Sequence, residues 1–266
     1  MKKLLIMAII FGAFHLATAA TTNVYVEDWG TVGAAAGGVP KSQNITLANV
    51  GWTEVAPAQP AGPPYIGIYY DSSAADNVTL AALPGRTVYF TLWTAAQTNS
   101  PNVPGIFYTT DTAGPGTYGD SSFTDINPTQ YTNLTLSVEV YEQNGPNDQG
   151  YFAVQVGGSW YVSTNNPLPA LALYPLFTNA TLVYTNPANV WNNLSIGATN
   201  ATIGSVASLS LTSPITGIGI VEFRTTAGFD YNQLAITAYA PNPPPPTAPS
   251  ITATAVTPQN VYVGGG

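Results

Sequence analysis

The acidic side chains are the main groups in this sequence that could carry out acid or base catalysis. The chain has no cysteine, and its single histidine, His15, lies in an amino-terminal segment that reads as a signal peptide. A Ser-His-Asp triad, a Cys-His pair and a zinc site of those ligands are therefore excluded from the mature chain. Two carboxylates alone can hydrolyse a glycoside. Glu139, Glu142 and Glu222 are the candidates, but no motif pairs them, and we expect no catalysis.

A second group of side chains could bind a sugar without transforming it. In the runs 88–93, 134–141, 151–156 and 159–163, apolar positions alternate with polar or aromatic ones, which face away from a core. If these runs share one sheet, that face is a platform of aromatic rings with polar groups between them. Pyranoses stack on aromatic rings, and their hydroxyls need paired donors and acceptors. The candidate ligand-binding residues are Tyr89, Trp93, Glu139, Tyr141, Tyr151, Gln155 and Trp160. The alternative is that these rings pack under loops or against a second sheet.

Acidic residues also stand at both ends of the predicted domain. Glu27 and Asp28 end the first predicted strand, and Asp230 begins the last one. In jelly rolls the first and last strands often lie side by side, which would bring these carboxylates together. Hard oxygen ligands of this kind suit calcium. The sequence therefore predicts one structural calcium ion held by Glu27, Asp28 and Asp230, with solvated surface acids as the alternative.

Short strands separated by turns must position these side chains. Period-two alternation recurs from residue 24 to residue 239, and stretches rich in Gly, Pro, Asn and Asp separate the runs. No long segment has helical spacing. The predicted fold is all-β, a two-sheet antiparallel β-sandwich of jelly-roll type.

The clearest hairpin in this pattern spans residues 151–163. Gly157 and Gly158 stand between two β-rich runs and fit a two-residue turn that needs positive φ. This turn places Gln155 opposite Trp160 on the face away from the core. The predicted core face carries Phe152, Val154, Val156 and Tyr161.

The amino terminus and the charge balance point to export. Lys2 and Lys3 precede an apolar run up to Phe14, and Ala17 to Ala19 form a small-x-small cleavage pattern. No other stretch is long and apolar enough for a membrane helix, so we expect no membrane insertion. The mature chain keeps three cations against thirteen acids, a net charge of −10. Nucleic acid and anionic lipid need clustered Lys and Arg, so neither is expected as a partner.

Composition divides the chain after residue 240. The proline-rich residues 241–249 predict a semi-rigid linker. Residues 250–266 read as the start of a truncated immunoglobulin-like repeat or as a disordered tail. The predicted organisation is a signal peptide over 1–20, a β-jelly-roll domain over 21–240, the linker and this last segment.

Three short motifs resemble secreted bacterial jelly-roll modules of the concanavalin-like and carbohydrate-binding type. They are Glu27-Asp28-Trp29, the hairpin from Val154 to Ser163, and a closing motif made of Gly217-Ile218-Gly219 and the segment from Phe229 to Thr237. The resemblance extends over residues 24–240. It implies a jelly roll, noncatalytic glycan binding and a calcium ion near the acids matched by Glu27 and Asp230. The chain departs from the usual Phe-Asp-Asn ending, because Tyr231 stands between Asp230 and Asn232.

These features favour a secreted, noncatalytic carbohydrate-binding module that holds a parent surface protein on a polysaccharide or cell-surface glycan. The abundant neutral hydrogen-bonding residues and the scarcity of lysine also fit a structural subunit of an extracellular filament, surface layer or adhesin, which would self-associate. A carboxylate-dependent polysaccharide hydrolase or lyase is the second alternative.

Overall fold

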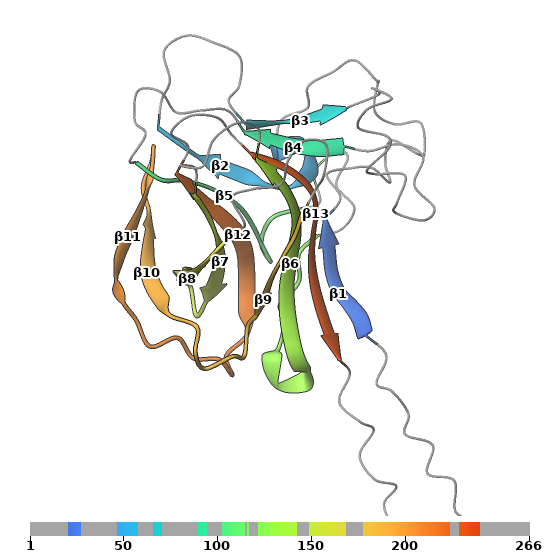
Figure 1. Cartoon of the computed structure of the whole chain (residues 1–266), viewed down its shortest axis with the longest axis vertical. Helices are drawn as coiled ribbons and strands as arrows, with labels where there is room; N and C mark the ends of the chain where they lie inside the picture. The colour runs from blue at the N-terminus through green and yellow to red at the C-terminus, as the bar shows by residue number, and fades with distance from the viewer. Residues whose placement is uncertain are drawn as a thin grey trace, which may run out of the picture.

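The computed structural model describes residues 21–27, 47–57, 66–70, 90–94, 103–114, 116, 122–142, 149–168, 178–223 and 229–239. Within these residues, the strands form two antiparallel sheets that pack face to face (Figure 1). Sheet A contains β1 (Thr21–Glu27), β3 (Ile66–Tyr70), β4 (Phe90–Thr94), β6 (Thr132–Glu142), β9 (Thr178–Val183) and β13 (Phe229–Tyr239). Sheet B contains β2 (Thr53–Val55), β5 (Gly105–Thr110), β7 (Gln149–Val156), β8 (Ser159–Pro167), β10 (Trp191–Ile196), β11 (Ala201–Val206) and β12 (Ile215–Phe223). Two short 3₁₀ turns, η1 (Leu47–Val50) and η2 (Pro128–Gln130), complete the described elements.

The predicted all-β, two-sheet antiparallel sandwich is confirmed. Sheet A has the order β3-β4-β13-β6-β9, with β1 also paired to β13, and sheet B has the order β11-β10-β8-β7-β12-β5-β2. The chain passes repeatedly from one sheet to the other, as in jelly rolls. Among the described residues, no helix is long and apolar enough to cross a membrane.

The first and last described strands lie side by side, as predicted. β1 and β13 are antiparallel, with Thr21 opposite Tyr239 and Glu27 opposite Leu234. Asp230 lies further along β13, opposite Trp93 of β4 and Tyr141 of β6.

The β7–β8 hairpin also has the predicted turn and register. Gly157 and Gly158 have φ values of 60° and 77°, which glycine adopts without steric cost. Gln155 lies opposite Trp160, and Val154 lies opposite Tyr161. The predicted core face is buried between the sheets at Phe152, Val154 and Val156, and Tyr161 packs against the same core while half-buried.

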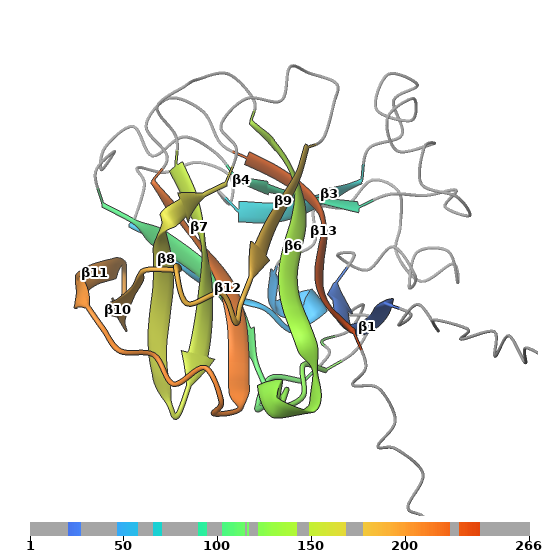
Figure 2. The same cartoon turned by 60° about the horizontal axis from the view of Figure 1, so that its bottom comes forward.

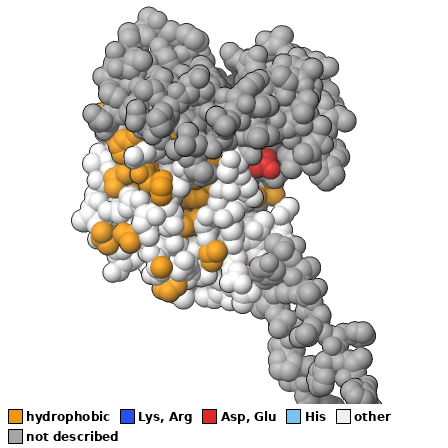
Figure 3. Space-filling model, viewed as in Figure 1, with side chains coloured by type: hydrophobic (Ala, Val, Ile, Leu, Met, Phe, Trp, Pro, Cys, Tyr) orange, Lys and Arg blue, Asp and Glu red, His pale blue; other side chains and the backbone are white. Residues whose placement is uncertain are grey.

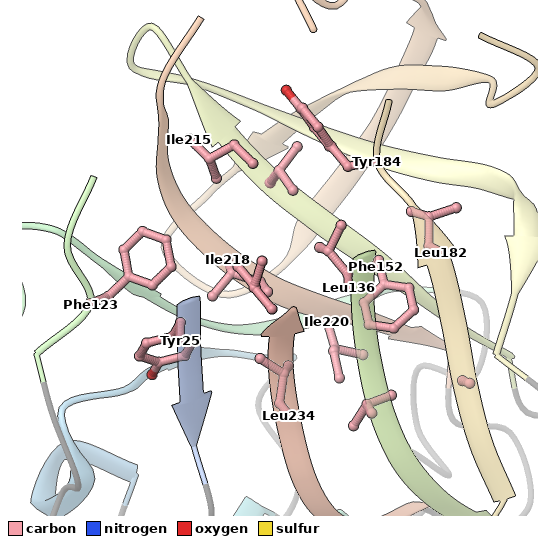
Figure 4. Close-up of a cluster of buried hydrophobic side chains, with 14 of the residues drawn as sticks. Tyr25, Phe123, Leu136, Phe152, Leu182, Tyr184, Ile215, Ile218, Ile220 and Leu234 are labelled. Carbon is pink, nitrogen blue, oxygen red and sulfur yellow. The ribbon is translucent and has the colours of Figure 1, made fainter. Parts of the chain in front are cut away.

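The main core lies between the two sheets (Figure 4). Leu136 and Leu182 of sheet A and Phe152 and Ile220 of sheet B are all at most 3% exposed. Truncating such a side chain to alanine typically costs about 2–5 kcal/mol, because it removes apolar burial and leaves a cavity. This inter-sheet core therefore fixes how the two sheets lie on each other.

A second, smaller core lies on the outer face of sheet B. It joins Ile106 of β5, Ala153 of β7 and Val221 of β12 to Leu194 of β10 and Ala201 of β11. Although β11 and β5 are far apart in the strand order, the Ala201 amide donates to the Pro104 carbonyl at 2.9 Å. The β10–β11 hairpin, seen at the edge of sheet B in Figure 2, therefore curls over this outer face.

Three of the predicted segments lie outside the described residues. These are the signal peptide over 1–20, the linker over 241–249 and the segment over 250–266.

Candidate functional site

The predicted aromatic platform does not form one surface, because its strands belong to different sheets. Trp93 lies on β4, and Glu139 and Tyr141 lie on β6, all in sheet A. Tyr151, Gln155 and Trp160 lie on β7 and β8 in sheet B, and Tyr89 is outside the described residues. The expectation of a shared sheet was wrong, since alternation shows which side of a strand a residue occupies but not which sheet the strand joins.

Trp160 lies on the face away from the main core, as predicted, but its ring is only 9% exposed. It packs edge-on against Tyr108 with ring centroids 5.0 Å apart. A Cβ atom built on Gly217 would lie 3.1 Å from the Trp160 ring, so the ring lies close above this glycine. Trp160 therefore contributes to the second core and does not present a free stacking surface.

Tyr151 and Gln155 are half-buried on the same outer face of sheet B. The Tyr151 hydroxyl donates to Gln149 Oε1 at 2.8 Å, and burial raises the pKa of Tyr151 above its usual value. Gln155 Oε1 accepts from Thr216 Oγ1 at 2.9 Å. Tyr151, Gln155 and Trp160 thus share a face, but neighbouring side chains already bond the polar ends of Tyr151 and Gln155.

Glu27, the described part of the predicted calcium site, is fully buried. Its Oε2 accepts from Trp52 Nε1 at 3.1 Å and lies 3.5 Å from the Tyr25 hydroxyl. Asp28 and the Asp230 side chain are outside what the structure describes. No group of three or more metal-ligating side chains gathers within the described part of the chain. The calcium ion therefore stays a prediction from sequence.

Two of the three candidate catalytic acids, Glu139 and Glu222, lie on opposite sides of sheet A, and the side chain of Glu142 is outside what the structure describes. Glu222 is 1% exposed on the inner face of sheet B, where the Tyr231 hydroxyl donates to its Oε1. Glu139 is half-buried on the outer face of sheet A, alternating with the core residues Val138 and Val140. The backbone of sheet A separates these two carboxylates, so they cannot flank one glycosidic bond as hydrolysis requires.

A cavity of about 410 Å³ lies between the edge of sheet A and the end of β8, and we call it the edge cavity. One wall is β9, the last strand of sheet A, and the other is formed by the end of β8 and by Leu168. Its lining residues are Phe152, Asn165, Asn166, Pro167, Leu168, Thr178, Asn179, Ala180 and Thr181. Two predicted ligand-binding residues lie next to these walls, since Glu139 is opposite Asn179 and Tyr151 is opposite Pro167.

Asparagine side chains fix the β8 wall of the edge cavity. Asn165 Oδ1 accepts from the Val190 amide at 2.8 Å, and its Nδ2 donates to the Ala188 carbonyl at 3.0 Å. Asn166 Nδ2 lies within hydrogen-bond distance of three acceptors, which are Asn165 Oδ1 at 2.9 Å, Ser163 Oγ at 3.1 Å and Asn189 Oδ1 at 3.2 Å. These bonds hold both amides in place before any ligand arrives.

Asn189 also ties the two walls together. Its Nδ2 donates to the Val183 carbonyl of β9 at 2.8 Å, while its Oδ1 accepts from Asn166 at the end of β8. One side-chain amide therefore bridges sheet A to sheet B beside the edge cavity.

The β9 wall offers polar groups that the rest of the described chain does not use. Asn179 and Thr181 are exposed, and their side chains make no hydrogen bond to another described residue. A ligand could therefore bond them without first breaking an internal hydrogen bond.

The edge cavity is electrically neutral. Its lining contains amides, hydroxyls, aliphatic groups and one aromatic ring, and none of its nine residues is charged. The described part of the chain includes no Lys, Arg or His, and the face in Figure 3 shows acidic but no basic side chains among those residues. Such a lining suits an uncharged ligand that has both hydroxyls and apolar C–H groups.

The sequence pattern did not predict the edge cavity, because only the packing of the two sheets brings its walls together. Asn165 and Asn166 stand near the end of a predicted strand with nothing to mark them as lining residues. The one available signal was the Asn179-Ala180-Thr181 triplet, whose alternation places two polar side chains on one side of a strand.

Comparisons with known proteins give distant structural likenesses. No protein-family model and no curated protein matches the chain. An exo-β-agarase structure is 11% identical with a TM-score of 0.39, and the match covers 77% of this chain and 26% of the agarase. The CBM2 module of the evolved Dit protein of Lactobacillus casei BL23 phage J-1 is 12% identical, with a TM-score of 0.32 and coverage of 84% and 97%. A carbohydrate esterase of the Shiga toxin-encoding bacteriophage phi24B is 8% identical, with a TM-score of 0.35 and coverage of 83% and 100%. At these TM-scores the likenesses transfer no residue role, ligand or activity to this chain.

Proposed function

We propose that this chain is a secreted, noncatalytic module that binds a neutral polysaccharide in the edge cavity. The observation that carries the proposal is the uncharged lining of amides, hydroxyls and apolar groups in a cavity of about 410 Å³. Cavities of roughly 300–1,000 Å³ with a few placed polar groups are typical of small-molecule sites. Export rests on the signal-peptide pattern of residues 1–20.

The hydrogen bonding of the polar side chains that line the edge cavity supports ligand binding. Asn165 and Asn166 are already held by neighbouring residues, so ordering them costs little when a ligand arrives. Asn179 and Thr181 have no described partner to lose. Sugar hydroxyls need donors and acceptors in this mixture, and their C–H faces can contact Phe152 and Leu168.

The placement of the acids supports binding over hydrolysis. Among the described side chains, Glu139 and Glu222 are the candidate acid and base, and sheet A separates them. No carboxylate lines the edge cavity. Glu139 and Glu222 therefore cannot act together in a two-carboxylate mechanism.

A structural subunit remains the second candidate, and the edge position of β9 favours it. An edge strand presents unpaired backbone groups that a strand of another copy could extend. Self-association through β9 would make the purified domain dimeric or filamentous, whereas a binding module that works alone would stay monomeric. Size-exclusion chromatography separates the two.

Calorimetric titration with a panel of neutral oligosaccharides tests the proposed site. The double variant Asn179→Ala, Thr181→Ala removes side-chain groups worth about 0.5–1.5 kcal/mol per hydrogen bond, so affinity falls by about tenfold. The matched control is Asn193→Ala, Ser195→Ala, which changes an exposed pair with the same spacing on β10. We expect the control to bind as the wild type does. Failure of the wild type to bind any neutral oligosaccharide, or an equal loss in both variants, contradicts the proposal.

A further inference from the structure

We infer that the edge cavity selects N-acetylated amino sugars, an inference that rests on the proposed function and names its ligand class. It comes from the free backbone edge of β9, which forms one wall of the edge cavity.

Two hydrogen bonds establish which backbone groups of β9 face the cavity side. The Tyr184 amide, one residue after β9, donates to the Leu134 carbonyl of β6 at 2.8 Å, so the groups of Tyr184 point towards β6. The Val183 carbonyl accepts from Asn189 Nδ2, so the groups of Val183 point away from β6. Because direction alternates along a strand, the N–H and C=O groups of Thr181 and Asn179 also point away from β6.

The β9 wall therefore offers backbone N–H and C=O groups, as the edge of a sheet does. An amide can bond such groups, because it also has one N–H and one C=O. The Val183 carbonyl is already bonded by Asn189 and by the Asn186 amide. The Thr181 N–H lies further along β9, where residues 178–181 line the cavity. An acetamido carbonyl can accept from this N–H as the carbonyl of an added strand would.

The opposite wall supplies the acceptor that the same acetamido group needs. A secondary amide holds its C=O and its N–H on opposite sides, as a peptide bond does. The Nδ2 of Asn166 faces acceptors on Ser163, Asn165 and Asn189, and no described residue donates to its Oδ1. An acetamido group can thus accept from β9 and donate towards Asn166, while its methyl group contacts the apolar part of the lining at Leu168 and Ala180.

The uncharged lining of the edge cavity also discriminates between acetylated and deacetylated sugars. Removing the acetyl group turns the amide into an ammonium ion, and a desolvated charge needs a counter-charge. The edge cavity has no carboxylate in its lining. Glu139 stands opposite Asn179, but it is not among the lining residues, so we expect the deacetylated sugar to bind more weakly than the acetylated one.

Titration of the domain with matched tetrasaccharides tests the inference. Chitotetraose and cellotetraose share the β-1,4-linked backbone and differ at C2, where an acetamido group replaces a hydroxyl. We expect chitotetraose to bind at least about tenfold more tightly than cellotetraose, and deacetylated chitotetraose to bind more weakly than either. Equal affinities for the first two would overturn the inference but leave the proposed function standing. Absence of binding to every neutral oligosaccharide would instead remove the proposed function itself.

The variant Thr181→Pro tests the backbone donor directly. Proline removes the N–H, and an edge strand tolerates it where that N–H faces away from the sheet. We expect the preference for chitotetraose to disappear in Thr181→Pro and to persist in Thr181→Ala, which keeps the N–H. If Thr181→Pro does not fold, the wild-type Thr181 amide resonance is followed by NMR during titration with chitotetraose. A shift of that resonance supports the inference, and a resonance unmoved at saturation contradicts it.

Discussion

Asparagine side chains serve as backbone substitutes at the end of β8. Asn165 bonds the Val190 amide and the Ala188 carbonyl, as an adjacent strand would. Asn189 bonds Val183 on β9 in the same manner. The abundance of asparagine in this sequence therefore has a structural use, which is to join segments where regular strand pairing ends.

Two aspartates also interact closely at the residue scale. Asp125 and Asp111 are both exposed, and the pKa of Asp125 is raised by desolvation, by a hydrogen bond to Asp111 and by repulsion from that carboxylate. A carboxyl whose folded pKa is raised contributes stability below its unfolded pKa. That contribution is lost as the pH rises through the folded pKa.

We therefore predict that Asp125→Asn raises the stability of the domain at neutral pH and loses this advantage near pH 3. The measurement is urea unfolding of both proteins at the two pH values, with EDTA present to remove divalent cations. Asp111→Asn, which removes the same repulsion, should behave alike. A larger stabilisation in acid than at neutral pH would contradict the assignment.

At the scale of one strand, β12 combines large residues on its inner face with glycine on its outer face. Ile218 and Ile220 enter the main core, while Gly217 lies under the ring of Trp160 and Gly219 lies against Cα and Cβ of Tyr108. These glycines make room for the neighbouring aromatic residues.

We predict that Gly219→Ala destabilises the domain by about 1–3 kcal/mol, the usual cost of overpacking. The added Cβ would lie 2.7 Å from the Phe107 carbonyl oxygen and 2.8 Å from Tyr108 Cβ, and backbone atoms cannot move aside cheaply. Gly114→Ala is the matched control, because nothing lies within 4 Å of its added Cβ. Equilibrium urea unfolding measures both, and equal stability of the two variants would contradict the prediction.

Local patterns predicted the elements better than their assembly. The period-two runs located the β7–β8 hairpin, its glycine turn and the sides on which Gln155 and Trp160 lie. They could not assign β6 and β7 to different sheets, because both runs alternate alike. The burial of Trp160 was also unpredictable, since it depends on Tyr108 and Leu194, whose strands pack against it only in the folded sheet.

For the candidate site too, the sequence indicated the kind of side chains but not where they come together. The low charge and the abundant Asn and Thr of the sequence agree with the uncharged, polar lining of the edge cavity. It did not locate the edge cavity, because Asn166 and Thr181 approach only when sheet A packs on sheet B.

At the scale of the whole molecule, the charge distribution separates the acidic surface from the uncharged cavity. The protein is acidic overall, with a sequence pI of about 4.2. The edge cavity itself carries no charged side chain. Binding of an uncharged glycan there involves no ion pair that salt could screen.

We therefore predict that the affinity for a neutral oligosaccharide changes less than about twofold between roughly 0.05 M and 0.5 M salt. Calorimetric titration at the two concentrations measures it, and an uncharged osmolyte at equal osmolarity controls for water activity. A steep loss of affinity with salt would indicate that charged groups hold the ligand.

The antiparallel pairing of β1 with β13 has a mechanical consequence. Thr21 and Tyr239 lie opposite each other at one end of the pair, so a pulling force applied at these two residues acts on that end first (Figure 1). Such a load separates the strands one hydrogen-bonded pair at a time and never loads all the bonds together. A domain tethered through both positions would therefore yield at low force from this corner, whereas β9, which lines the edge cavity, lies on the other side of β6.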